Sequence, residues 1–364
     1  MRKTLITIIV LLIGSISFIS LRMNTHTWKN TGNTKQNQKI TPSVTPTEIP
    51  IRMDLANDYH VYQTFNNCGP ASLSMALSHY DIFISQDELG EALRPYQNPT
   101  GDNDDKSVTL DEIGKKAKEY DLIPYHRADG DIELLTRLIA LDLPVITRTW
   151  LKADEDIGHY RVVTGYDKFS REIIQDDSYQ GPNRQYSYDE FNELWSKFGY
   201  EYLVLVPAEK KDTVEQVLGE KVNERVAWEN AKDKSEQILA QSPDDITARF
   251  NLSVAEYNLG NYQQSVAQYE IVQDKLPFRT LWYQIEPIQA YYELGGYDNV
   301  FSITDNILNN QNRAYSELYI IRGDSYMKLN RIDLAEQEYE KAVYYNRNLG
   351  TAKERLKSLP LTQQ

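Results

Sequence analysis

The feature that most constrains the fold is a repeat in the carboxy-terminal part of the chain. Three short motifs, each running from a Leu through two small or polar residues to a Tyr or Ile, follow one another at intervals of 35 residues. Around them, from about Asp212 onward, apolar residues recur at helical spacing and strand-like runs vanish. A period of this length indicates stacked helix pairs that bury their apolar faces against each other. The motifs are Leu259-Gly260-Asn261-Tyr262, Leu294-Gly295-Gly296-Tyr297 and Leu329-Asn330-Arg331-Ile332.

The repeat resembles the tetratricopeptide repeat, whose units span about 34 residues. This resemblance implies an all-α solenoid over residues 212–360, with three or four units and a degenerate first unit from about Asp212 to Asp245. It also implies a surface that binds a partner protein or peptide. A plain helical bundle is the alternative, and the regular period argues against it. The last unit is the fullest, with small and large residues where paired helices pack, namely Gly323, Tyr326, Ala335, Tyr339 and Ala342.

Length, charge and cysteine content restrict the classes of function. A chain of 364 residues is long enough for two domains with sizeable cores. Its formal net charge of −14, from 39 basic and 53 acidic residues, argues against nucleic acid or an anionic membrane surface as a partner. A single cysteine excludes a disulfide within the chain and the multi-cysteine zinc patterns, and the five histidines offer no ligand pair at helical spacing. We therefore expect no metal and no cofactor.

The amino terminus predicts export. Thr4 to Leu21 is an uncharged run of 18 residues behind Arg2 and Lys3, near the lower limit for a membrane span and longer than a typical signal-peptide core. The two basic residues keep the terminus in the cytoplasm. We expect residues 1–23 to form a signal anchor, a single transmembrane helix, and a cleaved signal peptide stays open as the alternative. Either route places the rest outside the cytoplasm, membrane-anchored or secreted, behind a disordered polar linker over residues 24–55.

The only cysteine lies in the stretch from Gln63 to Ser72. Pro70 is tolerated only in the first turn of a helix, and the apolar residues after it recur at helical spacing. Cys68 is therefore predicted at a helix N-terminus, where unpaired N–H groups and the helix dipole favour the thiolate. This position suits a nucleophile, although a lone cysteine often only fills space in a core. This stretch alone leaves both interpretations open.

His159 is the histidine predicted to serve Cys68 as a base. It follows Gly158 and an expected polar loop, Trp150 to Gly158, and stands at the mouth of a strand predicted over residues 160–166. The histidines judged less suitable are His26 and His60 ahead of the first folded element, His79 about three turns along the helix of the cysteine, and His126 in a strand with no acid in a suitable place.

An acid at the end of the next strand completes this set. Asp176 and Asp177 follow a strand-like run over residues 172–175, and Asp177 comes 18 residues after His159. If the two strands form a hairpin, the acid returns beside the histidine and can orient its imidazole. The alternative is an aspartate that caps a turn. Because helices precede these antiparallel strands, residues 56–208 are predicted to form an α+β domain, with an exposed loop over 99–106.

In order and spacing, these motifs resemble the papain-like cysteine peptidases of the bacteriocin-leader-processing, double-glycine type, especially their stand-alone relatives. The resemblance covers about residues 56–207. It implies a papain-like fold with Cys68 as nucleophile, His159 as base, Asp177 rather than Asp176 as the orienting acid, and Gln63 as an oxyanion-hole donor. This chain departs from the family at Asn67, where an acid often precedes the cysteine, and at Ser178, where a proline often follows the acid. The motifs that carry the resemblance are Gln63 with Cys68-Gly69-Pro70-Ala71, Gly158-His159-Tyr160 with Gly165-Tyr166-Asp167, and the acid with its turn.

Three functions remain open from the sequence. The first is an exported, membrane-tethered cysteine peptidase that cleaves peptide or protein substrates and binds a partner protein through its repeats. The second is a peptidase-like adaptor that binds peptides without turnover. The third is amidase or acyl-transferase chemistry on a non-peptide amide. The complete set of Gln, Cys, His and Asp favours the first, since a binding module has no need of all four.

Overall fold

The computed structural model of the chain describes residues 49–55, 58–96 and 108–360. All of them belong to one compact unit, which spans residues 48–364. The predicted signal anchor over 1–23, most of the predicted linker and the predicted loop over 99–106 lie outside the described residues. Among the residues that the structure does describe, no helix has the length and apolar character needed to cross a membrane.

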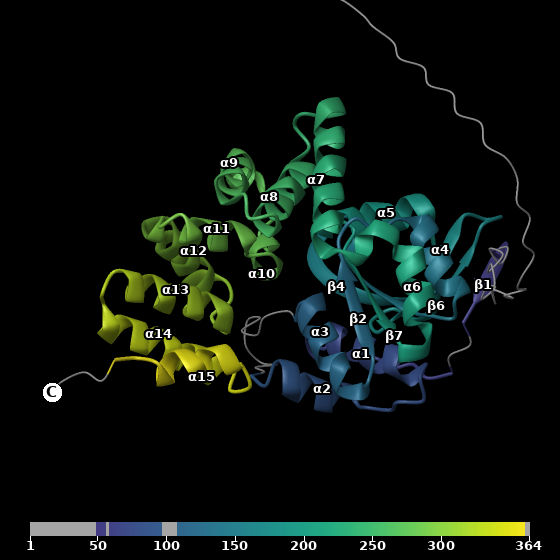
Figure 1. The fold of residues 1–364 in the computed structure, drawn as a ribbon, viewed down its shortest axis with the longest axis horizontal. Helices are drawn as coiled ribbons and strands as arrows, with labels where there is room; N and C mark the ends of the chain where they lie inside the picture. Colours follow the sequence, from purple (N-terminus) through teal and green to yellow (C-terminus); the bar gives the residue numbers. More distant parts are fainter. Residues whose placement is uncertain (1–48, 56–57, 97–107, 361–364) are drawn as a thin grey trace, which may run out of the picture. The chain divides into compact units, whose positions relative to one another are not determined.

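An antiparallel sheet forms the centre of the amino-terminal domain (Figure 1). In the described part of the chain its strands are β1 (Arg52–Asp54), β2 (Ile123–Arg127), β3 (Val145–Lys152), β4 (Glu155–Asp167), β5 (Glu172–Asp177), β6 (Gly181–Ser187) and β7 (Tyr202–Val206). Six of them lie in the order β2-β7-β3-β4-β5-β6, and β1 pairs with β4. All of these pairings are antiparallel, in agreement with the predicted α+β class.

Helices cover both faces of this sheet because its strands carry apolar side chains on both sides. In β7, Leu203 and Leu205 belong to the core formed with α1 and α3, whereas Tyr202 and Val204 belong to the core formed with α4 and α5. The helices on the first face are α1 (Cys68–Ser78), α2 (Gln86–Leu93) and α3 (Leu110–Ala117). Those on the second face are α4 (Ile132–Ala140), α5 (Tyr188–Trp195) and α6 (Lys211–Leu218). Residues 69–78 of α1 are all buried, so α1 is the central helix of its layer.

The region expected to be a loop between Trp150 and Gly158 is a hairpin. β3 continues to Lys152, β4 begins at Glu155, and Thr149 is the register partner of His159. His159 therefore lies within a 13-residue strand and not at its mouth, so that prediction was wrong. The glycine and acidic residues here are typical of loops, but backbone pairing across a β-bulge after Trp150 holds the segment in β structure.

The ends of the amino-terminal domain also extend beyond the prediction. β1 lies inside the segment predicted as linker, and its three residues pair with Asp167 to Gly165 of β4. At the other end, α6 falls in the region predicted as a degenerate repeat, yet Val214 and Leu218 are buried in the core beside α4. A pattern of apolar residues in one element indicates that one of its faces is buried, but not which neighbouring element covers that face. Neither boundary of the domain could therefore be predicted from the sequence.

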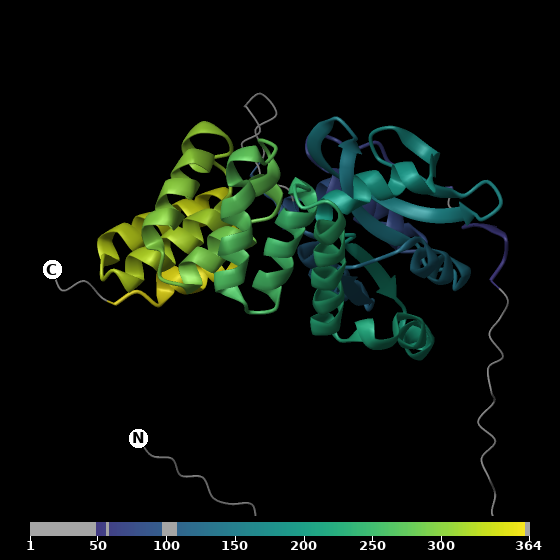
Figure 2. The ribbon, with the colours of Figure 1, turned by 90° about the horizontal axis from the view of Figure 1, so that it is seen from above.

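The carboxy-terminal region is a stack of helix pairs, coloured green to yellow in Figure 2. Its pairs in the described residues are α8 with α9, α11 with α12 and α13 with α14, and α7 packs against α8. The bounds are α7 (Glu224–Gln241), α8 (Ile246–Asn258), α9 (Tyr262–Val272), α10 (Thr280–Tyr283), α11 (Glu286–Glu293), α12 (Tyr297–Asn310), α13 (Ser316–Lys328), α14 (Ile332–Tyr345) and α15 (Gly350–Lys357).

The three repeated motifs form the turns inside these pairs. In each turn one residue has positive φ, namely Gly260 (82°), Gly295 (75°) and Asn330 (57°). Glycine adopts this left-handed conformation without steric cost, and asparagine tolerates it better than most residues. The 35-residue period of the sequence is therefore the period at which the chain reverses between paired helices.

We predict that Gly323→Ala destabilises the repeat region. A Cβ at Gly323 in α13 would lie 2.4 Å from the Cε1 atom of the buried Tyr339 ring in α14. The overpacking should cost about 1–3 kcal/mol, in spite of alanine's better helix propensity. Thermal unfolding measures the effect. The control is Gly350→Ala in α15, where a Cβ meets nothing within 4 Å. Equal midpoints for the two variants would contradict the close packing of α13 on α14.

Candidate active site

Cys68 is the first residue of α1, as the sequence predicts. It is half-buried, while the residues that follow it are buried, so its thiol lies where the helix end meets the surface. The backbone N–H of Tyr160 in β4 and the side chain of His159 both hydrogen-bond to the thiol group. The helix therefore presents the sulfur to the middle of β4.

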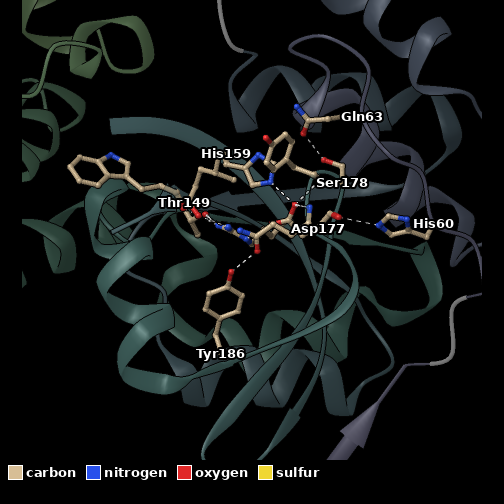
Figure 3. Close-up of polar contacts among 12 residues, drawn as sticks. His60, Gln63, Thr149, His159, Asp177, Ser178 and Tyr186 are labelled. Carbon is tan, nitrogen blue, oxygen red and sulfur yellow. Dashed lines mark hydrogen bonds and ion pairs between the residues drawn. The ribbon is translucent and has the colours of Figure 1, made fainter. Parts of the chain in front are cut away.

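Asp177 ends β5 and lies against His159 (Figure 3). Its Oδ1 atom is 2.9 Å from His159 Nε2. The contact follows from the β4–β5 hairpin, in which Arg161 is the register partner of Asp177. Because the carboxylate occupies Nε2, the other ring nitrogen, Nδ1, remains for Cys68. Asp176 points elsewhere: its Oδ1 accepts a hydrogen bond of 3.0 Å from the N–H of Asn183.

The three side chains favour a thiolate paired with an imidazolium. Burial disfavours the charged thiolate, but the hydrogen bond and positive charge of His159 outweigh it and lower the pKa of Cys68. Burial likewise disfavours the imidazolium, yet the hydrogen bonds to Asp177 and Cys68 raise the pKa of His159. Burial would raise the pKa of Asp177, but His159 and Arg161 hold it well below its usual range. Each group thus stabilises the charge of its neighbour.

Gln63 lies beside this group, in the segment that leads to α1 (Figure 3). The Ser178 hydroxyl donates a 2.8 Å hydrogen bond to Gln63 Oε1, and the Gln63 N–H donates one of 2.8 Å to the Ser178 carbonyl. Since the amide oxygen is engaged, the NH₂ group of Gln63 is the part left to donate. The serine that replaces the family's frequent proline therefore orients the Gln63 amide.

Arg161 is a member of this cluster that the sequence reasoning did not identify. It is fully buried and donates from Nε to Asp177 Oδ2 at 2.8 Å. Its other nitrogens bond to Thr149 and to the carbonyls of Trp150 and Leu151 at the end of β3. Arg161 is part of the sequence motif around His159. An arginine in a strand is expected to be exposed, however, and only the strand register shows that Arg161 lies opposite Asp177.

Arg94, which Asn67 holds, also affects the pKa of Cys68, although neither residue was among the predicted site residues. Arg94 donates from Nε to Asn67 Oδ1 at 3.2 Å and from Nη2 to the Phe65 carbonyl at 2.6 Å. Its positive charge is a further cause that lowers the pKa of Cys68. Asn67 accepts the hydrogen bond without adding a negative charge, so the departure from the family's acidic residue favours the thiolate.

Two histidines that were set aside also have partners. His126 was judged to lack an acid, but its Nε2 lies 3.4 Å from Oε2 of Glu201, the residue directly before β7, so that judgement was wrong. The acid is 75 residues away and comes close only through the β2–β7 pairing. His60 Nε2 lies 3.0 Å from the Asp177 carbonyl oxygen, and this contact stabilises the turn that follows β5. Within the described residues, no group of three or more potential ligands is arranged to hold a metal ion.

A mixed helix-and-sheet domain with this Cys, His and Asp cluster has the architecture of the cysteine-peptidase class. Residues 23–203 match the Peptidase_C39 like family, and residues 316–349, which contain α13 and α14, match the Tetratricopeptide repeat. The amino-terminal part of the chain therefore belongs to the Peptidase_C39 like family and is followed by a tetratricopeptide-repeat region. No curated protein matches the chain.

Several solved structures match part of this chain. A C39-like peptidase from Bacillus anthracis is 17% identical, with 43% of this chain and 97% of that chain covered and a TM-score of 0.36. The peptidase domain of Streptococcus ComA, a bifunctional ABC transporter of a quorum-sensing pathway, is 24% identical, with 40% and 96% covered and a TM-score of 0.32. A double-glycine-motif protease from an AMS/PCAT transporter, in complex with the leader peptide, is 16% identical, with 43% and 94% covered and a TM-score of 0.32.

We predict that Asp177→Ala destabilises the fold by about 3–5 kcal/mol at pH 7, because it leaves Arg161 buried without its carboxylate. Asp176→Ala, the control, removes a buried acid whose carboxylate accepts a hydrogen bond from the backbone N–H of Asn183, and it should cost about 1 kcal/mol. Urea unfolding measures both. The pKa of Asp177 is lowered by folding, so its contribution is present above its unfolded pKa of about 3.9 and is lost as the pH falls through the folded value. A difference between wild type and variant that persists unchanged in acid would contradict this account.

We also predict that Asn67→Asp makes Cys68 a weaker acid. The new carboxylate would pair with Arg94 and oppose the charge that stabilises the thiolate, so alkylation at about pH 6 should slow by about 3- to 10-fold. Asn67→Ala, which removes the contact without adding charge, is the control, and its profile against pH should lie closer to wild type. If both substitutions shift the profile equally, charge at this position is not the cause.

Proposed function

We propose that the chain is a thiol peptidase that hydrolyses peptide bonds, with Cys68 as nucleophile, His159 as base, Asp177 as orienting acid and Gln63 as oxyanion donor. The observation that carries this proposal is the hydrogen-bonded series from Cys68 through His159 to Asp177. Nothing in the packing of a plain core requires a half-buried thiol to meet a histidine that is itself held by a carboxylate.

The first half of the reaction forms an acyl-enzyme. The Cys68 thiol gives its proton to His159, and the thiolate attacks the carbonyl carbon of the scissile bond. The carbonyl oxygen becomes an oxyanion, stabilised by the Gln63 NH₂ group and the Cys68 backbone N–H. As the tetrahedral intermediate collapses, the C–N bond breaks and His159 gives its proton to the departing amine. Asp177 stabilises the imidazolium throughout.

The second half releases the acid product. Neutral His159 takes a proton from water, and the hydroxide attacks the thioester carbonyl at the same oxyanion position. The C–S bond then breaks, the carboxylic acid leaves, and the proton returns to the thiolate–imidazole pair. Each role uses a group already present in the chain, and no step requires a metal or cofactor.

The adaptor function is less well supported, because binding a peptide does not require a low thiol pKa. Amidase or acyl-transferase chemistry would use the same thiol, and the choice between a peptide and another amide rests on the family, since residues 23–203 match peptidases.

We further propose that residues 1–23 anchor the protein to the membrane with the folded part outside the cytoplasm. The support for this is the uncharged run behind two basic residues.

The experiment is alkylation of the full chain with iodoacetamide as a function of pH. We expect Cys68 to react well below the ordinary thiol pKa of about 8.5, and the low-pH reactivity to disappear in His159→Ala. His126→Ala is a matched control, since that histidine also contacts a carboxylate but lies away from the thiol.

Hydrolysis of a quenched peptide library then tests turnover, with Cys68→Ala as the blank. A reactive, His159-dependent thiol without peptide hydrolysis would favour the adaptor or a non-peptide amide. A thiol that is inert at low pH, or indifferent to His159, would remove the basis of the proposed function.

A further inference from the structure

The segment of the repeat region around α10 lies against the β3–β4 hairpin, close to His159. Asp156 of β4 accepts two hydrogen bonds from Arg279, at 2.8 Å from its backbone N–H and at 2.6 Å from Nη1. Arg148 of β3 donates from Nη2 to the Tyr283 carbonyl at 2.8 Å. These bonds fix α10 to the same hairpin that carries the candidate base.

Tyr283 is the residue of this segment that reaches the site. The backbone N–H of Gly158, the residue directly before His159, lies close enough to the Tyr283 hydroxyl to lower the pKa of Tyr283, against the larger rise that burial causes. The ring lies so close to Gly158 that a Cβ there would be 2.9 Å from the Tyr283 Cε1 atom. Gly158 has no positive φ that would itself require a glycine. The glycine of the Gly158-His159 motif is therefore explained by contact with the repeat region.

Tyr283 also lies within electrostatic reach of the nucleophile. Burial is the main cause that raises its pKa to about 12, and the charge of Cys68 is a further one. On its other side the ring packs edge-on against Phe198, with ring centroids 5.8 Å apart. It also borders a cavity of about 610 Å³, whose lining includes Arg148 and Glu286. Tyr283 thus lies between the repeat helices and the Cys68–His159 pair.

We propose that Tyr283 is a positioning residue of the peptidase site, so that the tetratricopeptide-repeat region completes this site and does not serve only to bind partners. By packing on Gly158, Tyr283 fixes the strand that holds the His159 imidazole at Cys68. The inference rests on the proposed function. It follows physically because displacement of a base by about 1 Å costs a large factor in rate, and the contact removes the freedom of the residue next to it.

The test compares Tyr283→Phe and Gly158→Ala with wild type, all as full chains. The first removes the hydroxyl and keeps the ring, and the second pushes a Cβ into the ring. Each should lower alkylation of Cys68 at about pH 6, and kcat/KM for any cleaved peptide, by about 3- to 10-fold, through a weaker thiolate–imidazolium pair. Tyr269→Phe is the control, because Tyr269 is equally buried in the repeats but packs on Tyr291, away from the site.

A double variant distinguishes the loss of the Tyr283–Gly158 contact from general destabilisation of the fold. In Gly158→Ala with Tyr283→Ala the added Cβ meets no ring, so the double variant should be no worse than Tyr283→Ala alone. Variants that melt earlier but keep the wild-type pH profile of alkylation would overturn the inference and leave the proposed function intact. A wild-type chain without a low-pH thiolate would overturn the proposed function, and this inference with it.

Discussion

The charge arrangement around Asp177 is the interaction on which the site depends. Its carboxylate is fully buried and accepts hydrogen bonds from His159, from Arg161 and from the backbone N–H groups of Tyr179 and Gln180. A buried charge is tolerated only with such a set of partners. One carboxylate therefore joins the end of β5, the middle of β4 and, through Arg161, the end of β3. The position of the His159 imidazole is therefore a consequence of how the sheet buries the Asp177 carboxylate.

The surrounding fold explains why the thiol and the base meet. β4 lies at the centre of the sheet between β3 and β5, and α1 packs against it with Cys68 at its first position. The same strand extends back to Glu155, where the repeat region is bonded to Asp156. A second contact lies at the other end of the repeats, where Asn348 donates to the carbonyls of Glu91 and Ala92 in α2. The repeats are thus packed on both the β3–β4 hairpin and the α2 layer of the peptidase domain.

Much of this architecture follows from local patterns. The helix at Cys68, the β4–β5 hairpin and the turns of the helix pairs were predictable because proline, alternation and positive-φ glycines act on their immediate neighbours. The sequence could also single out Cys68, His159 and Asp177, since the hairpin brings the last two together. Arg161, Ser178 and Tyr283 could not be found in this way. Their roles depend on register and on packing between residues far apart in the chain, which a pattern within one element does not encode.

The most direct test of the central claim is the charge state of His159, measured by nuclear magnetic resonance of the imidazole nitrogens in the full chain. The signal is assigned by its absence in His159→Ala. Because the hydrogen bonds to Asp177 and Cys68 raise its pKa, we predict that His159 keeps its proton to a higher pH in the wild type than in Cys68→Ala. A titration of His159 that is the same with and without the Cys68 thiol would contradict the account.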